Sequence, residues 1–281
     1  MHSSPRTYCI IGDPIDHSLS PAMQNAAFSA LGLNCTYIAF KVTAQELEQS
    51  VESLRSIKVA GFNVTIPHKV QVMKFLDELD HSAEKAAAVN TVNNIEGILK
   101  GYNTDIHGFI EPLRRRKVDF QGMHVLLLGA GGAARAIVAA LSEQIGIAKV
   151  IIANRDPNRA KELADIGSEL GLDCGTVSLD QASRISPDSD LIVNSTSMGM
   201  KNEPSIIDHT HIKKGSIIYD IVYRPITTDL IENAKYAQAV VVHGYEMLIE
   251  QGARAFELWT GIPAPRDVMK KSLLGVFGEP T

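Results

Sequence analysis

The sequence is poor in several features, and each shortage argues against a class of protein. Its 281 residues include only three cysteines, without a CxxC spacing, which is typical of reduced thiols in a cytoplasmic protein and not of a disulfide framework. No apolar run is long enough to cross a bilayer, and the N-terminus lacks a basic and apolar signal, so we expect a cytoplasmic protein with no membrane partner. The nine histidines form no close cluster with cysteine or carboxylate residues, so we expect no metal site.

The sequence also lacks a large excess of positive or negative charge. The net charge is −5, and the longest basic run, 114–117, falls at the end of an expected helix, where cations complement the helix dipole. We therefore expect no nucleic-acid partner. The chain does have many apolar residues, 45% of the total against 21% charged residues, which is enough for a full core in one large or two modest domains.

The order of the expected elements indicates an α/β protein. In the first third of the chain, strands are expected at 8–12, 36–42 and 61–66, with two more around Glu96-Gly97. From His124 onward six parallel strands are expected, at 125–128, 149–153, 174–178, 191–194, 216–220 and 239–242. The predicted fold class is therefore α/β in two domains, an N-terminal α/β domain and a Rossmann-type, doubly wound parallel sheet.

Helix starts are predicted mainly from capping residues. Ser20 and Pro21 suit the N-cap and the first helical position, and Thr43 with Glu46 has the pattern of a capping box. Further helices are expected to open at Pro67-His68-Lys69 and to span 105–116, 244–260 and 265–274. We expect the last two of these helices to pack on the first domain.

The stretch from His124 to Val138 predicts a phosphate-binding element. A buried strand, Val125–Leu128, is followed directly by glycines and then by helix-forming residues. Glycines let the backbone approach phosphates closely, and a helix N-terminus offers unpaired N–H groups. Ala134 replaces the third glycine of the dinucleotide fingerprint, which the looser pattern allows. The expected phosphate-binding residues are Gly129, Ala130, Gly131, Gly132 and Ala133.

Eight motifs occur in an order that resembles the shikimate dehydrogenase family, over about residues 8–274. They are Gly61-Phe-Asn-Val-Thr-Ile-Pro-His-Lys69, Ala88-Val-Asn-Thr91, Gly101-Tyr-Asn-Thr-Asp105, Gly129-Ala-Gly-Gly-Ala133, Asn154-Arg155, Asn194-Ser-Thr-Ser-Met-Gly199, Tyr219-Asp-Ile-Val-Tyr223 and Gly244-Tyr-Glu-Met-Leu-Ile-Glu-Gln251. The resemblance implies reversible, NADPH-linked reduction of 3-dehydroshikimate to shikimate in aromatic amino-acid biosynthesis. It also implies that residues 1–105 with 243–281 form the substrate-binding domain and that residues 106–242 form the NADP-binding Rossmann domain.

Other functions remain open at this point. A quinate/shikimate dehydrogenase using NAD or both cofactors would need the same reactive residues. A non-catalytic NADP-binding regulator on this scaffold would be expected to lack Lys69 or Asp105, and both are present. A dehydrogenase of the methylenetetrahydrofolate type gives no reason for Ser18, Ser20 and Asn90 to act together. The oligomeric state is open between monomer and homodimer.

The expected catalytic pair is Lys69 and Asp105. Reducing a ketone needs a hydride, which the cofactor supplies, and a proton, which the protein must supply. Lys69 is the candidate proton donor, because a place in the first turn of a helix and partial burial would lower the pKa of its ammonium group. Which of Lys69 and Asp105 transfers the proton stays open at this point. Asp105 would hydrogen-bond that ammonium and a substrate hydroxyl. In isolation the two residues resemble a surface lysine and a helix N-cap, and the resemblance assigns both to the active site.

The expected substrate pocket is polar, because shikimate carries one carboxylate and three hydroxyls. The resemblance implies that Ser18 and Ser20 hold the carboxylate and that Tyr223 lies near it. It assigns the ring hydroxyls to Thr65, Asn90, Asp105 and Gln251. Without the resemblance these residues would be read as turn, cap or solvated residues. Gln24 stands where the family usually has His, and we expect it to act only indirectly.

The expected cofactor is NADP (NADPH). An NAD enzyme usually has Asp or Glu after the second strand, whereas this strand is followed by Asn154, Arg155 and Arg159, and two arginines can clamp a 2′-phosphate. Asp156, where the family commonly has Thr, would repel that phosphate unless it points away or caps the next helix, so dual NAD use stays open. The resemblance places Thr196 beside the ribose on the nicotinamide side and Ile221 and Gly244 along the nicotinamide.

Overall fold

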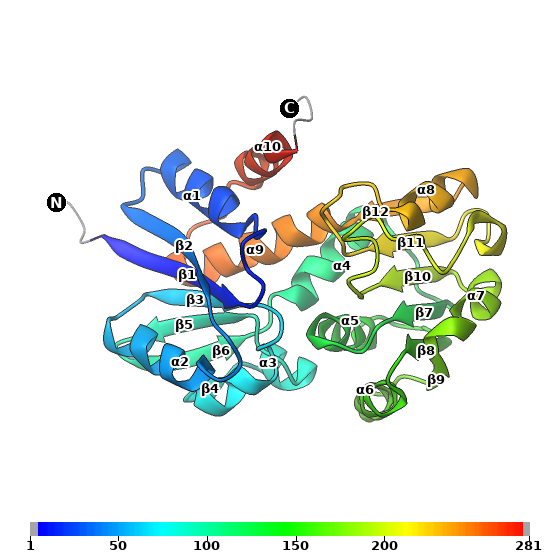
Figure 1. The fold of residues 1–281 in the computed structure, drawn as a ribbon, viewed down its shortest axis with the longest axis horizontal. Helices are drawn as coiled ribbons and strands as arrows, with labels where there is room; N and C mark the ends of the chain where they lie inside the picture. Colours follow the sequence, from blue (N-terminus) through cyan, green and yellow to red (C-terminus); the bar gives the residue numbers. More distant parts are fainter. Residues whose placement is uncertain (1–4, 278–281) are drawn as a thin grey trace. The chain divides into compact units, whose positions relative to one another are not determined.

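The computed structural model describes residues 5–277, and the chain divides into two compact units (Figure 1). The first unit combines the chain up to Gly108 with the chain from Ile249 onward, and the second is Phe109–Leu248. The divisions fall inside two helices, α4 (Asp105–Arg115) and α9 (Gly244–Thr260).

The first unit is built on a six-stranded sheet with the order β2-β1-β3-β5-β6-β4. Its strands are β1 (Arg6–Gly12), β2 (Cys35–Lys41), β3 (Gly61–Val64), β4 (Glu78–Leu79), β5 (Thr91–Ile95) and β6 (Ile98–Tyr102). β1 is parallel to β2 and β3, whereas β5 is antiparallel to β3 and forms a hairpin with β6. Glu96 and Gly97 both have positive φ, as the favoured two-residue hairpin turn requires. The expected strands are confirmed, and β4 is too short to leave a sequence pattern.

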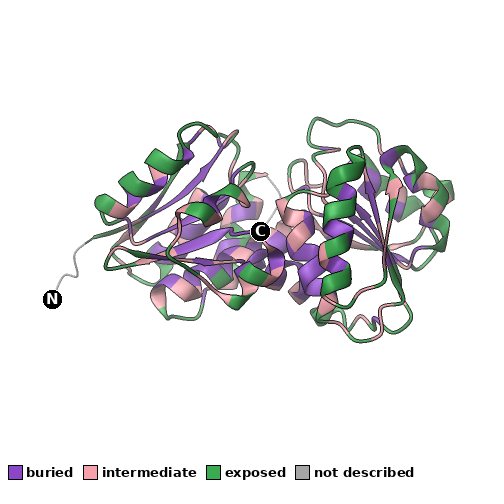
Figure 2. Cartoon of the chain, turned by 90° about the horizontal axis from the view of Figure 1, so that it is seen from below, coloured by how far each residue is buried: buried purple, intermediate pink, exposed green. Residues whose placement is uncertain are grey.

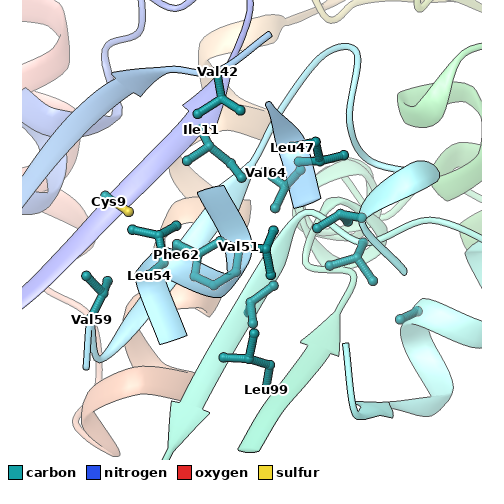
Figure 3. Packing of buried hydrophobic residues seen from close by; sticks show 14 residues of the cluster. Cys9, Ile11, Val42, Leu47, Val51, Leu54, Val59, Phe62, Val64 and Leu99 are labelled. Carbon is teal, nitrogen blue, oxygen red and sulfur yellow. The ribbon is translucent and has the colours of Figure 1, made fainter. Parts of the chain in front are cut away.

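One face of this sheet is covered by α2 (Leu47–Ser56). Val51 and Leu54 of the helix pack with Cys9, Phe62 and Leu99 of the strands in a fully apolar cluster (Figure 3). β1 and β3 are largely buried, while the outer side of the helix is exposed (Figure 2). The alternation of β1 therefore supplies Cys9 and Ile11 to this core and leaves the residues between them for the opposite face.

The opposite face is covered by α1 (Ser20–Ala30), the Ile249–Thr260 part of α9 and α10 (Arg266–Val276). Tyr8 stacks on Phe28 of α1 and on Trp259 of α9, with ring centroids 5.4 and 4.9 Å apart. The Trp259 indole N–H donates to the Val92 carbonyl at 3.0 Å, and the Ser272 hydroxyl donates to the Ala22 carbonyl. The last two helices thus pack on the first unit.

The predicted helix at Pro67-His68-Lys69 is wrong. These residues form turns, and only a short 3₁₀ helix, η1 (Gln71–Phe75), follows. The buried His68 ring is hydrogen-bonded to the Val42 carbonyl, and the Lys69 carbonyl accepts from the Val89 N–H at 2.7 Å instead of from a residue one helical turn ahead. Tertiary contacts therefore override local propensity here, and the helix-dipole argument for Lys69 does not apply.

Two other helix starts are shifted. α1 begins at Ser20 with Leu19 as its N-cap, so Ser20 is inside the helix and not its cap. Glu46 accepts hydrogen bonds from the Thr43 N–H and hydroxyl, but α2 begins only at Leu47. α3 (His81–Ala86) has a capping aspartate, Asp80, which accepts from the Ser82 N–H.

The second unit is a doubly wound parallel sheet with the order β12-β11-β10-β7-β8-β9. Its strands are β7 (His124–Leu128), β8 (Lys149–Asn154), β9 (Cys174–Ser178), β10 (Leu191–Asn194), β11 (Ile217–Asp220) and β12 (Val240–His243). All neighbouring strands pair in parallel, which confirms the six predicted strands and the Rossmann-type order. The order reverses between β7 and β10, so the carboxyl ends of these strands mark the expected ligand site.

Helices cover both faces of the second sheet. α5 (Gly132–Ser142) and α6 (Pro157–Glu169) share one face, where Gly167 of α6 lies close to Val138 of α5. Phe109 of α4 stacks on Tyr219 of β11 at 4.9 Å. On the other face, α7 (Ala182–Ile185) and α8 (Asp229–Tyr236) pack with Leu126, Ile192 and Ile218. No helix within residues 5–277 is long and apolar enough to span a membrane.

Candidate active site and cofactor site

The glycine turn lies at the carboxyl end of β7. Gly129 has φ +103, a conformation that favours glycine, and a Cβ there would lie 2.7 Å from the Ser195 hydroxyl oxygen. Gly131 is the N-cap of α5, and a Cβ on it would meet no atom of the described chain within 4 Å. Ala134 is fully buried, which suits the packing role of the third fingerprint glycine. The turn thus offers open backbone and a helix N-terminus, which fit the phosphates of a dinucleotide.

The carboxyl end of β8 carries the residues expected to select the cofactor. Asp156 is the N-cap of α6, where its carboxylate accepts from the backbone N–H groups of Asn158 and Arg159. The Asn154 side chain donates to the Asp156 carbonyl at 2.9 Å, which holds the start of this loop. Arg155 is exposed, and the Arg159 side chain is 71% exposed, 3.7 Å from Asp156. Asp156 therefore serves its own helix, and both guanidinium groups are accessible to an anion.

Thr196 lies in a tight turn after β10. Its N–H and hydroxyl both donate to the Asn194 side-chain carbonyl, and the hydroxyl accepts from the Met198 N–H. The turn touches the glycine turn, because Ser195 donates to the Leu128 carbonyl from both its N–H and its hydroxyl. The structure therefore brings the predicted Thr196 next to the predicted phosphate-binding glycines.

Ile221, Tyr223 and Gly244 also belong to the second unit. Gly244 begins α9, and a Cβ on it would lie 2.4 Å from the Ile221 carbonyl oxygen, so only glycine allows this close approach. Ile221 follows β11 directly, and burial raises the pKa of the Tyr223 phenol. Ile221 and Gly244 are thus brought together, and the contact of Tyr223 with a substrate carboxylate stays a prediction.

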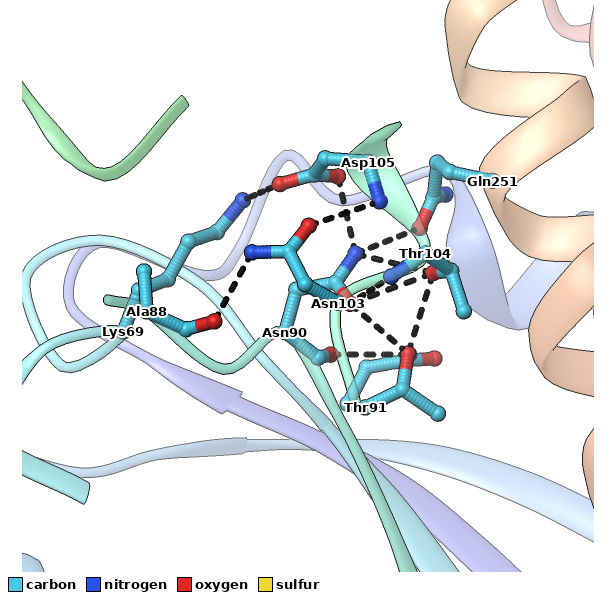
Figure 4. Close-up of polar contacts among 9 residues, drawn as sticks. Lys69, Ala88, Asn90, Thr91, Asn103, Thr104, Asp105 and Gln251 are labelled. Carbon is cyan, nitrogen blue, oxygen red and sulfur yellow. Dashed lines mark hydrogen bonds and ion pairs between the residues drawn. The ribbon is translucent and has the colours of Figure 1, made fainter. Parts of the chain in front are cut away.

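The predicted catalytic pair is an ion pair in the first unit. The Lys69 ammonium donates to Asp105 Oδ2 at 2.5 Å, and the two side chains are only 13% and 6% exposed (Figure 4). Lys69 lies in the turn after β3, and Asp105 is the first residue of α4. The Asn103 side chain accepts from the Asp105 N–H at 3.1 Å, which orients the start of the helix. A buried cation and carboxylate at this distance can hold and exchange a proton.

Asn90 and Gln251 join this pair. The Asn90 amide donates to Asp105 Oδ1 at 2.8 Å and reaches the Gln251 side-chain oxygen at 3.4 Å (Figure 4). Its carbonyl accepts from the Thr104 N–H at 2.7 Å. Four predicted site residues, Lys69, Asn90, Asp105 and Gln251, thus form one hydrogen-bonded group. Lys69 and Asn90 come from segments next to strands, and Asp105 and Gln251 come from α4 and α9.

A buried network of polar side chains holds Asn90, and through it the Lys69–Asp105 group, in place. The Tyr37 hydroxyl donates to the Asn63 side-chain oxygen at 2.6 Å, and the Asn63 amide donates to the Thr91 hydroxyl and to the Asn90 carbonyl. The Thr91 hydroxyl donates in turn to the Asn90 side chain. Burial raises the pKa of Tyr37 well above its usual value, and a side-chain hydrogen bond with Ser20 opposes that shift. The contact of Ser20 with a substrate carboxylate stays a prediction.

Ser18 and Thr65 lie in the loops that follow β1 and β3. Ser18 accepts a long hydrogen bond from the Ser20 N–H, and a Cβ on Gly12 would lie 2.3 Å from the Thr65 methyl group. The hydrogen bonds that the described chain gives these two residues do not reach Lys69 or Asp105. Gln24 is buried and donates to the Gly252 carbonyl, next to Gln251, which agrees with an indirect role.

Several residues of the site were not singled out in the sequence. Thr91, Asn103 and Thr104 position Asn90 and Asp105, and Asp220 anchors Asn194 at 2.9 Å. All four lie inside motifs that already pointed to the site, so their polarity next to a buried strand was the available signal. Burial raises the pKa of the Asp220 carboxyl to about 6, and hydrogen bonds from Thr228, Val222 and Asn194 oppose the shift.

These observations define a class of protein. A doubly wound parallel sheet with a glycine turn at its switch point is the framework of dinucleotide-binding enzymes. Combined with a buried lysine–carboxylate pair in a second α/β unit, it defines a two-domain oxidoreductase that uses a nicotinamide cofactor.

The particular family follows from comparisons with known proteins. Family models match at residues 10–92 (shikimate dehydrogenase substrate binding domain), 112–221 (shikimate / quinate 5-dehydrogenase) and 244–274 (shikimate 5'-dehydrogenase C-terminal domain). A shikimate dehydrogenase (NADP(+)) from Nitrosopumilus maritimus is 47% identical over 97% of this chain and 99% of its own length. The chain belongs to the shikimate dehydrogenase family.

Solved structures agree. Shikimate 5-dehydrogenase from Thermus thermophilus, in complex with NADP(H) and shikimate, has a TM-score of 0.85 and 35% identity, covering 96% of this chain and 99% of its own. Quinate dehydrogenase from Corynebacterium glutamicum, in complex with NAD, has a TM-score of 0.88 and 28% identity, covering 96% and 99%. The fold is thus shared by members with different substrates and cofactors, and the residues of the site must decide between them.

Proposed function

We propose that this chain catalyses the reversible, NADPH-dependent reduction of 3-dehydroshikimate to shikimate, a step of aromatic amino-acid biosynthesis. The observation that carries the proposal is the buried Lys69–Asp105 ion pair with Asn90 and Gln251 around it. A group made of an ammonium, a carboxylate and two amides suits a small ring with several hydroxyls, because each hydroxyl can then be paired.

In this proposal the first unit binds the substrate and the second unit binds the cofactor. When bound, NADPH supplies the hydride that adds to the carbonyl carbon. Lys69 donates a proton to the carbonyl oxygen, so the ketone becomes a secondary alcohol with atoms and charge balanced. Asp105 accepts from the Lys69 ammonium, holds it in place and accepts from a substrate hydroxyl. In the reverse direction the same lysine takes the proton back.

The proposed cofactor preference is for NADP. Arg155 and Arg159 are accessible at the carboxyl end of β8, where a 2′-phosphate would lie, and guanidinium groups bind phosphate with charge-assisted hydrogen bonds. Asp156 is engaged by two backbone N–H groups of α6, which reduces its repulsion of the phosphate. The backbone of residues 129–132 would bind the pyrophosphate. Thr196, Ile221 and Gly244 would contact the nicotinamide half of the cofactor.

The proposal includes a cytoplasmic location and a monomeric or homodimeric state. Cys9, Cys35 and Cys174 are all free thiols, as in a reducing compartment. The edge strand β2 leaves Ile38 and Phe40 partly exposed beside an unpaired backbone edge, which is where a homodimer could form.

Steady-state assays of the purified protein test the proposal. Shikimate and quinate are each offered with NADP and with NAD, and kcat/KM is measured for the four combinations. The expected result is the highest kcat/KM for shikimate with NADP. Failure to oxidise shikimate with either cofactor would overturn the proposed activity, and a higher kcat/KM for quinate would transfer it to the quinate enzyme.

A further inference from the structure

Asp220, at the end of β11 in the second unit, is a fully buried carboxylate whose hydrogen-bond donors are all uncharged. It accepts from the Asn194 amide at 2.9 Å, from the Val222 N–H at 3.0 Å and from the Thr228 hydroxyl at 2.5 Å. Burying a carboxylate without a cation costs free energy, even when it is hydrogen-bonded. A neutral residue would fold here at lower cost, so the carboxylate calls for a reason beyond stability.

One function of the Asp220 carboxylate is to orient the Asn194 side chain at the end of β10. The Asn194 amide nitrogen donates to Asp220 and to the Met198 carbonyl, so its oxygen is free to accept from the Thr196 N–H and hydroxyl. An amide can be turned end for end, but a carboxylate only accepts, and Asp220 therefore fixes which end of Asn194 faces the turn. The 194–199 turn also packs on the glycine turn after β7, where a Cβ on Gly129 would lie 3.1 Å from the Thr196 methyl group.

On the other side Asp220 fixes the segment after β11. The Val222 N–H that it binds follows Ile221, whose carbonyl packs against Gly244. Thr228, which donates to the second carboxylate oxygen, is the N-cap of α8 and accepts from the Ile231 N–H. One side chain thus ties together the ends of β10 and β11 and the start of α8, around the positions that line the proposed nicotinamide site.

We propose that Asp220 is a positioning residue for the cofactor, holding the 194–199 turn and Ile221 in the arrangement that the nicotinamide half of NADP requires. This inference rests on the proposed function for the identity of the cofactor. It predicts that loss of Asp220 weakens NADP binding much more than shikimate binding, because the Lys69–Asp105 group proposed to bind shikimate lies in the first unit.

Calorimetry on three variants tests the inference. Asp220→Ala should raise the Kd of NADP about tenfold or more, because several buried polar groups lose their partner. Asp220→Asn keeps an oxygen for the Val222 N–H and the Asn194 amide but can be turned end for end, so its Kd for NADP should lie between those of wild type and Asp220→Ala. Ser189→Ala is the matched control, because it removes a buried hydroxyl bonded to the Ile185 carbonyl near the opposite end of β10. It should lower the Tm and leave the Kd of NADP unchanged.

The outcomes separate positioning from a merely structural role. The inference is overturned if Asp220→Ala binds NADP as tightly as wild type, or if its affinities for shikimate and NADP fall together. If Asp220→Ala does not fold, Asn194→Ala decides, since it removes only the relay and must give the same selective loss of NADP affinity. If the wild-type protein binds NADP but does not oxidise shikimate, the proposed function is wrong. The calorimetric test of Asp220 can still be carried out, because it measures NADP binding and needs no turnover.

Discussion

The Lys69 ammonium lies 2.5 Å from the Asp105 carboxylate, in a largely buried part of the candidate active site. Because both side chains are shielded from water, neither charge can be removed without leaving the other unpaired. The pair is therefore both a structural element of the first unit and the source of the proton in the proposed reaction.

Lys69→Ala should lower kcat for shikimate oxidation about 10²–10⁴-fold, because it removes the group that exchanges the proton. The Kd of NADP should change little, since the cofactor residues lie in the second unit. Lys100→Ala is a suitable control, because Lys100 pairs with Glu78 at 3.5 Å, away from the Lys69–Asp105 group, and its kcat should stay near wild type. A Lys69→Ala enzyme with more than a tenth of wild-type kcat would argue against this role.

The arginines after β8 should control the cofactor preference. Replacing both Arg155 and Arg159 by Ala should raise the KM for NADP about tenfold or more and leave the KM for NAD nearly unchanged, because only NADP carries the 2′-phosphate. Asp156→Asn keeps the N-cap of α6 and removes the charge, so it should improve NADP use slightly with little loss of stability. An equal increase in the KM values for NADP and NAD would show that the arginines do not bind the 2′-phosphate.

The architecture could be predicted well where the sequence pattern is local. Six apolar runs spaced by helix-forming stretches gave the parallel sheet of the second unit, and Glu96-Gly97 gave the hairpin of the first. The start of η1 could not be predicted, because the turn at Lys69 is held by bonds to Val42 and Val89, which are distant in the sequence. Local propensity favoured a helix there, and tertiary contacts decided otherwise.

The pairing of Lys69 with Asp105 could be predicted from the sequence, and the residues that hold the site in place could not. Lys69 and Asp105 were assigned to the active site through their motifs, whereas Asp220, inside the motif 219–223, was assigned no role. Its importance depends on Asn194 and Thr228 lying beside it, and those contacts arise from the parallel pairing of β10 and β11. Similarly, the capping role of Asp156 was one of two readings until the geometry of α6 was known.

Substitution of Gln24 tests the stability of the protein and should leave its catalytic rate nearly unchanged. Its amide nitrogen donates to the Gly252 carbonyl, but its buried oxygen has no partner among the described residues. Gln24→Met loses one hydrogen bond, worth about 1 kcal/mol, and removes an unpaired acceptor that costs about 1–3 kcal/mol. Urea unfolding should therefore show unchanged or increased stability, with kcat near wild type. A loss of more than about 2 kcal/mol would mean that the Gln24 oxygen is paired in solution.

The pH dependence of stability should report on Asp220. Burial raises the pKa of its carboxyl from 3.8 to about 6, so between these values the folded protein keeps a proton that the unfolded chain releases. The contribution of Asp220 to stability is therefore full below about pH 4 and is lost as the pH rises through about 6. Two pKa units correspond to about 3 kcal/mol at most.

The comparison with Asp220→Asn isolates this effect, because all other titrating groups are common to both proteins and cancel in the difference. Urea unfolding of both proteins at several pH values from about 4 to 8 should show wild type losing stability relative to the variant as the pH rises to about 6, and a constant difference above about 7. A difference that does not change with pH would mean that the Asp220 carboxylate ionises in the folded protein as easily as in the unfolded chain, and that its burial is compensated by the hydrogen bonds from Thr228, Val222 and Asn194.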